Sequence, residues 1–159
     1  KVGRLWLVSD EEAVVGKLGP EPLAEDFTFE AFHERLSRRK GAIKPILLDQ
    51  SVVAGIGNIY ADEALFAAGI HPLRRVRDLS EQEMLALYHA IRAVLAGGVR
   101  GRGTSVDRYR DGYGRPGSYQ EQLQVFRRAG EPCPVCGTPI QRLVVAGRGT
   151  HICPQCQRL

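Results

Sequence analysis

Four cysteines near the end of the chain constrain its fold more than any other feature. Cys133 and Cys136 form one C-x2-C pair, Cys153 and Cys156 form a second, and sixteen residues lie between the two pairs. Four thiolates at this spacing can surround one Zn²⁺ tetrahedrally, and a site that is saturated in this way is structural. Two disulfides are the alternative, but nothing else in the sequence indicates secretion. The spacing therefore predicts one structural zinc ion.

The residues between the two cysteine pairs predict a hairpin, and so a zinc ribbon. We expect strands over 140–146 and 150–152, joined by a turn at Gly147–Gly149. Arg148, between the two glycines, is then expected at the tip with its guanidinium projecting, which alone is a weak sign of function. His151 is a possible metal ligand, but the four thiolates already complete the site. We therefore expect His151 on the hairpin surface.

The length and charge of the chain limit its domain count and the kinds of partner it can have. The 159 residues suffice for one ordinary domain or two small ones, and 43% of them are hydrophobic. No apolar run approaches the roughly 20 residues that span a bilayer, so we expect a soluble chain without membrane contact. The net charge is +4, and residues 100–159 contain ten arginines but only four acidic side chains. Arginine suits phosphate oxygens, which favours an anionic partner over a merely solvated basic surface.

The middle of the chain predicts helices with short connections. A helical pattern starts at Thr28, a short helix fits "AIKPILLD", and "NIYADEALFAAG" reads as a helix closed by Gly69. Ser80 and Glu83 form a capping-box pattern before a long apolar helix. The sequence therefore predicts a mainly α fold with a small β zinc ribbon.

The two ends of this helical unit read differently. Residues 1–8 alternate like a strand, and a Gly- and Pro-rich linker follows them. The start "KVGRLW" resembles an interior strand, so we expect the chain to be part of a longer protein. From Gly97 the sequence "GGVRGRGTSVDRYRDGYGRPGSY" has no apolar period and predicts a long functional or mobile loop.

The stretch "VVAGIGNIYADEALF" places Gly55, Gly57 and Asn58 just before a helix. Paired glycines indicate either a forced turn or close approach by another molecule. Together with "KLGPEPL", "AIKPILLDQ", "GRPGSYQEQLQVF" and "GRGTHICPQCQR", this stretch resembles, in order and spacing, the bacterial formamidopyrimidine-DNA glycosylase family over nearly the whole chain. The related endonuclease VIII group shares the architecture, but the sequences of these motifs are more similar to those of the formamidopyrimidine branch.

The resemblance implies a helix–two-turns–helix unit followed by a zinc ribbon, without the family's N-terminal β-sandwich. The implied division is 1–24 for the end of a catalytic domain and linker, 25–126 for the DNA-binding unit, and 127–159 for the finger. The implied activity is excision of oxidised purines, such as 8-oxoguanine and formamidopyrimidines, followed by β,δ-elimination at the abasic site. The implied partner is damaged double-stranded DNA, bound by a monomer in the bacterial cytoplasm at the nucleoid.

The resemblance also assigns roles to residues. Asn58 would present its amide and the helix N-terminus to a DNA phosphate, although a plain Asn N-cap is the alternative. Lys40 matches a DNA-contacting position, and Lys44 is expected near the same DNA backbone or simply at the surface. Arg148 matches the finger-tip arginine, for which we favour electrostatic stabilisation of the leaving phosphate over proton donation. The loop at about 101–119 would close over the everted base.

The family's amine nucleophile, an N-terminal proline followed by glutamate, has no counterpart in these residues. Lys40 or Lys44 could replace it in principle, but neither is flanked by the acid that the mechanism needs. We therefore expect this chain alone to bind DNA without catalysis. The alternatives are a stand-alone zinc-dependent nucleic-acid-binding module and a ribbon used only for protein contacts.

Overall fold

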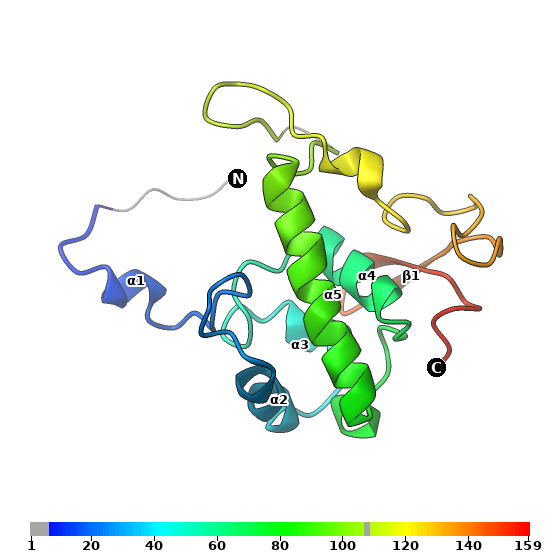
Figure 1. Ribbon diagram of the computed structural model, residues 1–159, viewed down its shortest axis with the longest axis horizontal. Coiled ribbons are helices and arrows are strands. Elements are labelled where there is room, and N and C mark those ends of the chain that lie inside the picture. The colour runs from blue at the N-terminus through cyan, green and yellow to red at the C-terminus, as the bar shows by residue number, and fades with distance from the viewer. Residues whose placement is uncertain (1–6, 107–108) are drawn as a thin grey trace.

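The structure is a computed structural model that describes residues 7–106 and 109–159. The strand expected over 1–8 lies largely outside the described residues, and Leu7 and Val8 belong to no strand. A one-turn helix, α1 (Glu12–Val15), lies just before the expected Gly- and Pro-rich linker. The segment that carries α1 extends away from the other helices (Figure 1). No helix in the described ranges has the length and apolar character needed to cross a membrane.

The predicted helical unit is present. Its longest element, α5, crosses in front of the shorter helices in Figure 1 and packs against α4 and α2. A short 3₁₀ turn, η1, precedes α5. The elements are α2 (Phe29–Ser37), α3 (Ile43–Leu47), α4 (Asn58–Ala67), η1 (Val76–Asp78) and α5 (Glu81–Arg100).

Local sequence signals set the starts of two helices as predicted. The hydroxyl of Thr28 accepts a hydrogen bond from the backbone N–H of Ala31 at the start of α2. Ser80 and Glu83 make both bonds of a capping box at the start of α5. Such caps each stabilise a helix by about 1 kcal/mol. The helices therefore begin where short-range chemistry requires it.

One apolar core holds the helical unit, and a smaller one lies under the finger. The second core contains two of the cysteines, so the metal site and the finger's packing form a single unit. Apolar burial of this kind is the main stabilising contribution in both units. The larger core includes Phe32, Leu36, Ile43, Leu47, Val53, Ile56, Leu65, Ile70, Leu87 and Ile91, and the smaller one Phe66, Val125, Cys133, Ile140 and Cys153.

Two glycines inside α5 allow close approach by tyrosines. A Cβ on Gly97 would lie 2.7 Å from Cε2 of Tyr119, and a Cβ on Gly98 would lie 2.3 Å from Oη of Tyr60. Tyr119 begins a 3₁₀ turn, η2 (Tyr119–Gln122), where the chain returns from the loop. The sequence change seen at Gly97 therefore reflects packing inside a continuing helix, since α5 runs to Arg100.

The finger is an antiparallel two-stranded hairpin, as predicted, but its turn lies earlier than expected. Strands β1 (Gln141–Val145) and β2 (Arg148–Ile152) pair with Val145 opposite Arg148. The turn residues are Ala146 (φ 49°) and Gly147 (φ 75°). A two-residue turn with both φ positive matches the twist of the strands. Arg148 is thus the first residue of β2 and does not lie within the turn.

Candidate nucleic-acid interface and metal centre

The four cysteines converge as their spacing predicts. One ligand atom from each lies within 4.8 Å of the other three, and all four cysteines are free of disulfides. The Sγ atoms of Cys136 and Cys153 are 3.4 Å apart, and those of Cys133 and Cys156 are 3.8 Å apart. A tetrahedron with Zn–S bonds of about 2.3 Å has sulfur–sulfur edges of about 3.8 Å. The site therefore fits one structural zinc ion.

Backbone groups support this metal site. The N–H of Val135 donates to Sγ of Cys133, and the N–H of Cys156 donates to Sγ of Cys153, each at 3.4 Å. Donors of this kind orient thiolate ligands around a metal. Buried Gln157 accepts a hydrogen bond from the N–H of Cys153 and donates one to the carbonyl of Ile70. The second knuckle is therefore tied to the helical unit.

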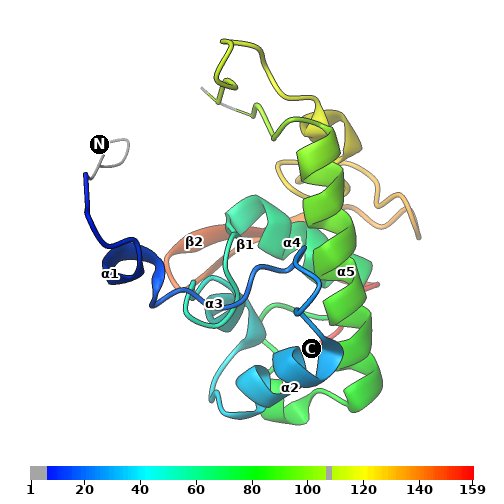
Figure 2. The same cartoon turned by 60° about the vertical axis from the view of Figure 1, so that its left-hand side comes forward.

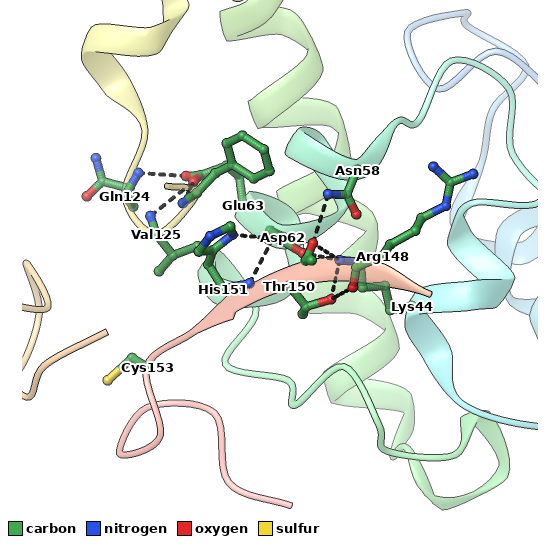
Figure 3. A network of polar contacts seen from close by, with 12 residues as sticks. Lys44, Asn58, Asp62, Glu63, Gln124, Val125, Arg148, Thr150, His151 and Cys153 are labelled. Atoms are coloured by element: carbon green, nitrogen blue, oxygen red, sulfur yellow. Dashed lines mark hydrogen bonds and ion pairs between the residues drawn. The ribbon is translucent and has the colours of Figure 1, made fainter. Parts of the chain in front are cut away.

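A buried ion pair joins the finger to the helices (Figure 3). Nζ of Lys44 in α3 lies 2.5 Å from Oδ1 of Asp62 in α4, and neither side chain is exposed. Nζ also donates to Oγ1 of Thr150 in β2 at 2.7 Å. Burial lowers the pKa of Lys44, and the nearby charge of Arg148 acts in the same direction, against Asp62. The expectation of a surface Lys44 is therefore wrong, because α3 packs against α4 and the hairpin covers it.

His151 also differs from its expected position. Its backbone N–H lies 2.9 Å and its Nδ1 3.2 Å from Oδ2 of Asp62, and only 6% of its surface is exposed. Its ring packs edge-on against Phe126. The expectation that His151 lies on the hairpin surface is wrong, because this face of β2 packs on α4. The single carboxylate of Asp62 therefore bonds both to Lys44 of α3 and to His151 of β2.

The next acidic residue, Glu63, holds the chain that leads into the finger. Its carboxylate accepts three backbone N–H groups, from Gln124, Val125 and Phe126, at 2.8 to 3.0 Å. Burial raises the pKa of Glu63, while these bonds favour its charged form. Asp62 and Glu63 together fix both the hairpin and its linker on α4 (Figure 3).

Asn58 connects the start of α4 to the hairpin. It is the first residue of the helix, and Gly57 is the N-cap, so a plain Asn N-cap is excluded. Its Nδ2 donates to the carbonyl oxygen of Gly149 at 2.9 Å. Oδ1 of Asn58 is the one buried side-chain polar atom without a hydrogen-bond partner in the described part of the chain. A Cβ on Gly57 would meet nothing within 4 Å.

Gly55 and Gly57 have different roles in the backbone before α4. Gly55 has φ +76°, a value that non-glycine residues rarely adopt, so it makes the turn. Gly57 has an ordinary extended φ and faces open space. The first N–H groups of α4 have no intrahelical partner, and no N-cap side chain competes for them. The start of α4 is therefore open to an anion.

Arg148 lies next to this helix start. Gly149, which accepts the bond from Asn58, is its direct neighbour in β2, and the guanidinium of Arg148 extends away from the buried network (Figure 3). Within the described ranges the guanidinium forms no ion pair or hydrogen bond, and the residue is exposed. The structure thus brings Asn58 and Arg148 together, while exposed Lys40 lies beyond the end of α2 and buried Lys44 points into the network.

The loop after α5 borders the same hollow as Asn58. A hollow of about 330 Å³ is lined by residues of the α4 start and of the loop, including Asn58, Tyr60, Thr104 and Tyr109. Oη of Tyr60 and Oγ1 of Thr104 are 3.0 Å apart, which connects the loop to α4. The role predicted for residues 101–119 remains a prediction, and two of them lie outside the described residues.

The sequence reasoning overlooked several residues of this site. Asp62, Thr150 and the carbonyl of Gly149 carry its internal bonds, yet none was singled out. One signal was available. Asp62 and Glu63 are adjacent acids inside an otherwise apolar helical stretch, and buried acids occur almost only with partners.

Two family models match this chain. A model described as the formamidopyrimidine-DNA glycosylase H2TH domain matches residues 18–109, and one described as a zinc finger found in FPG and IleRS matches residues 130–159. Formamidopyrimidine-DNA glycosylase of Herpetosiphon aurantiacus is 54% identical over 160 residues, which cover 99% of this chain and 58% of that protein. The one of Symbiobacterium thermophilum is 55% identical, over 90% of this chain and 47% of that protein.

Solved structures of Fpg proteins superpose closely on this chain. The MutM (Fpg) protein of Thermus thermophilus superposes with a TM-score of 0.88 and 48% identity, over 94% of this chain and 57% of that one. A complex of Lactococcus lactis Fpg with DNA containing an abasic site superposes with a TM-score of 0.84 and 44% identity, over 90% of this chain and 52% of that one. The chain spans about half the length of these relatives, from 47% to 58%. It belongs to the formamidopyrimidine-DNA glycosylase family.

Proposed function

We propose that this chain binds the backbone of duplex DNA at an oxidised purine or an abasic site. One observation carries the proposal: the bond between Asn58 and Gly149 holds the backbone next to exposed Arg148 against the open start of α4. Unpaired N–H groups at a helix N-terminus and an adjacent arginine fork form a ready site for a phosphate group. We call Asn58 and Arg148 the phosphate clamp.

Asn58 would donate its second Nδ2 hydrogen to the phosphate, since the first is held by Gly149. Arg148 would neutralise the charge and, in the elimination step, stabilise the leaving phosphate. A guanidinium is protonated at all relevant pH values, so its role is that of an electrostatic partner and not of an acid. Lys44 would act indirectly as a positioning residue, because its buried ammonium holds Thr150 and the hairpin.

At the level of the whole protein, we propose a bifunctional DNA glycosylase/lyase of base excision repair, acting as a monomer on bacterial nucleoid DNA. The support is the similarity to formamidopyrimidine-DNA glycosylases and to Fpg–DNA complexes. This chain contributes DNA binding, and the ribbon's zinc supplies rigidity because its four thiolates leave no open position. Elimination needs an amine nucleophile, for which the phosphate clamp offers no candidate.

Fluorescence anisotropy with the zinc-loaded chain tests this proposal. One labelled duplex is intact and a matched one carries a stable abasic-site analogue, and both are titrated over a salt series. We expect tighter binding to the abasic duplex, with affinity falling steeply as salt rises. Equal affinity for both duplexes would contradict lesion recognition by this chain, and salt-independent binding would contradict phosphate contact.

A further inference from the structure

Gln50, in the loop between α3 and α4, holds two separate stretches of backbone. Its Oε1 accepts the N–H of Gly55 at 2.9 Å, and its Nε2 donates to the carbonyl of Ile56 at 2.8 Å. Its backbone carbonyl accepts the N–H of Gly19 at 2.7 Å. Because Gln50 is an exposed residue, hydrogen bonds rather than burial fix its side chain.

The bond to Ile56 sets the orientation of the peptide unit just before α4. The C=O and N–H groups of a planar trans peptide point in opposite directions. Gln50 holds the carbonyl of the peptide between Ile56 and Gly57, so the N–H of Gly57 points away from Gln50. The N–H groups of Gly57 and Asn58 donate no hydrogen bond within the described ranges. Gln50 therefore helps to leave two backbone donors free at the start of α4.

The turn that Gln50 holds borders the hollow beside the phosphate clamp. Gly55, Gly57 and Asn58 line this hollow, and Gln50 is not among the described residues that line it. Gln50 therefore acts there through the backbone that it holds. The turn needs such support, because glycine has more backbone freedom than other residues. The bond from Gln50 reduces this freedom at Gly55, whose φ is +76°.

The backbone of Gln50 is itself fixed by the segment that precedes α2. Beside the bond from Gly19, the N–H of Ala54 donates to the carbonyl of Pro20 at 3.1 Å. A Cβ on Gly19 would lie 2.6 Å from the carbonyl carbon of Val52, so the two segments are in direct contact. The loop before α4 is therefore anchored along this side.

The same segment is fastened to α5. Nη1 of Arg92 in α5 lies 2.8 to 3.3 Å from three backbone carbonyl oxygens, those of Pro22, Ala24 and Phe27. Figure 2 shows the segment, in blue between α1 and α2, reaching α5 before it turns toward α2. Gln50 is thus held by the helical unit, which gives its side chain a fixed base from which to hold the turn.

We infer that Gln50 is a positioning residue of the phosphate site: it holds the backbone of Gly55 and Ile56 so that the free N–H groups at the start of α4 face the phosphate. This inference rests on the proposed function. A hydrogen bond weakens steeply when its donor is not aimed at the acceptor. Loss of the Gln50 amide should therefore weaken the contact with that phosphate and leave the rest of the DNA contact unchanged.

Anisotropy titrations of the zinc-loaded chain on two duplexes test the inference. Both duplexes carry the same stable abasic-site analogue, and in one of them the phosphates that flank the analogue are replaced by neutral methylphosphonates. The test variants are Gln50→Ala and Gln50→Met, of which the second keeps the length of the side chain without its amide. Gln82→Ala is the matched control, because Gln82 is an exposed residue of α5 whose side chain forms no hydrogen bond within the described ranges. Far-UV circular dichroism and zinc content verify the fold of each variant.

We expect both Gln50 variants to bind the natural duplex about tenfold more weakly than the parent, because two hydrogen bonds that order the site are lost. Both should match the parent on the methylphosphonate duplex, and Gln82→Ala should match it on both duplexes. Amide hydrogen exchange at Gly55, followed by NMR, should be faster in Gln50→Ala. Parent-like affinity for the natural duplex, equal loss on both duplexes, or unchanged exchange at Gly55 would overturn the inference.

Asn58→Ala separates this result from a test of the proposed function. It should weaken binding to the natural duplex and leave binding to the methylphosphonate duplex unchanged. If Asn58→Ala shows this pattern and the Gln50 variants do not, the phosphate clamp stands and positioning by Gln50 is wrong. If Asn58→Ala has no effect on either duplex, the clamp itself is wrong, and the inference falls with it.

Discussion

Nζ of Lys44 lies 2.5 Å from Oδ1 of Asp62, and both side chains are fully buried between α3, α4 and the hairpin. This pair gives the finger its position, because Asp62 also accepts the backbone N–H of His151 and Lys44 also donates to Thr150. The proposed phosphate clamp of half-buried Asn58 and exposed Arg148 therefore rests on a buried ionic network.

Asp62→Asn should reduce the free energy of unfolding by about 3 kcal/mol, because it leaves the charge of Lys44 buried without its counter-ion. Urea unfolding of the zinc-loaded chain measures this loss. The double variant Asp62→Asn with Lys44→Met removes both charges and should recover most of the stability. A single variant as stable as the parent, or a double variant no more stable than the single one, would contradict the role of the pair.

Arg148→Ala should leave zinc content and thermal stability unchanged and weaken binding to abasic DNA about tenfold. Arg148 is exposed, and its guanidinium forms no hydrogen bond or ion pair within the described ranges, so its loss should remove a phosphate contact without breaking an internal bond. The salt slope should fall by about one. Arg148→Lys is the matched control, which keeps the charge but loses the fork. If Arg148→Ala unfolded the hairpin, the side chain would be structural.

The sequence predicts those parts of the site that depend on residues close together in the chain, and it misses those that depend on residues far apart. The cysteine spacing and the capping box of Ser80 act over short distances, and both were read correctly. The burial of Lys44 and His151 follows from packing of segments about a hundred residues apart, which periodicity does not encode. The hairpin turn lies earlier than predicted because Ala146 adopts a positive φ of 49°, whereas the glycines at 147 and 149 made a turn between them the expected choice.

Cys153→Ser should release zinc and melt the hairpin while the helices persist, because the helical unit has its own apolar core. Zinc is measured by atomic absorption, and helix content by far-UV circular dichroism. Val135→Ser, an exposed change in the first knuckle, should retain one zinc ion per chain. Loss of the helical signal together with zinc would show that the helices depend on the finger.

Gly98→Ala should lower the melting temperature by several degrees, although alanine favours helix by about 1 kcal/mol. The new Cβ would lie 2.3 Å from Oη of Tyr60, so the tyrosine must move and its contact with Thr104 is lost. Gly112→Ala is the matched control, because nothing lies within 4 Å of its Cβ position. Equal melting temperatures for the two variants would show that the close approach of Tyr60 does not constrain α5.

The capping box at α5 should give an acid-dependent contribution to stability. The hydrogen bond from Arg74, and then the backbone N–H of Ser80, hold the pKa of Glu83 below 4.5. A lowered pKa contributes stability above the unfolded value, and this contribution is lost as pH falls below about 4.5. Glu83→Gln should therefore be less stable than the parent by about 1 kcal/mol at neutral pH. The difference should shrink steadily as the pH falls below about 4.5. Urea unfolding across this pH range measures the difference, and a constant difference would contradict this cause.

The central claim is that Asn58 and Arg148 hold one phosphate together. A double-mutant cycle tests it most directly. Asn58→Ala, Arg148→Ala and the combined variant are each titrated by anisotropy against the duplex that carries the stable abasic-site analogue. We predict that the combined loss is smaller than the sum of the single losses, with a coupling of about 1 kcal/mol or more. Additive losses within about 0.5 kcal/mol would mean that the two residues act on separate parts of the DNA, and the clamp as described would be wrong.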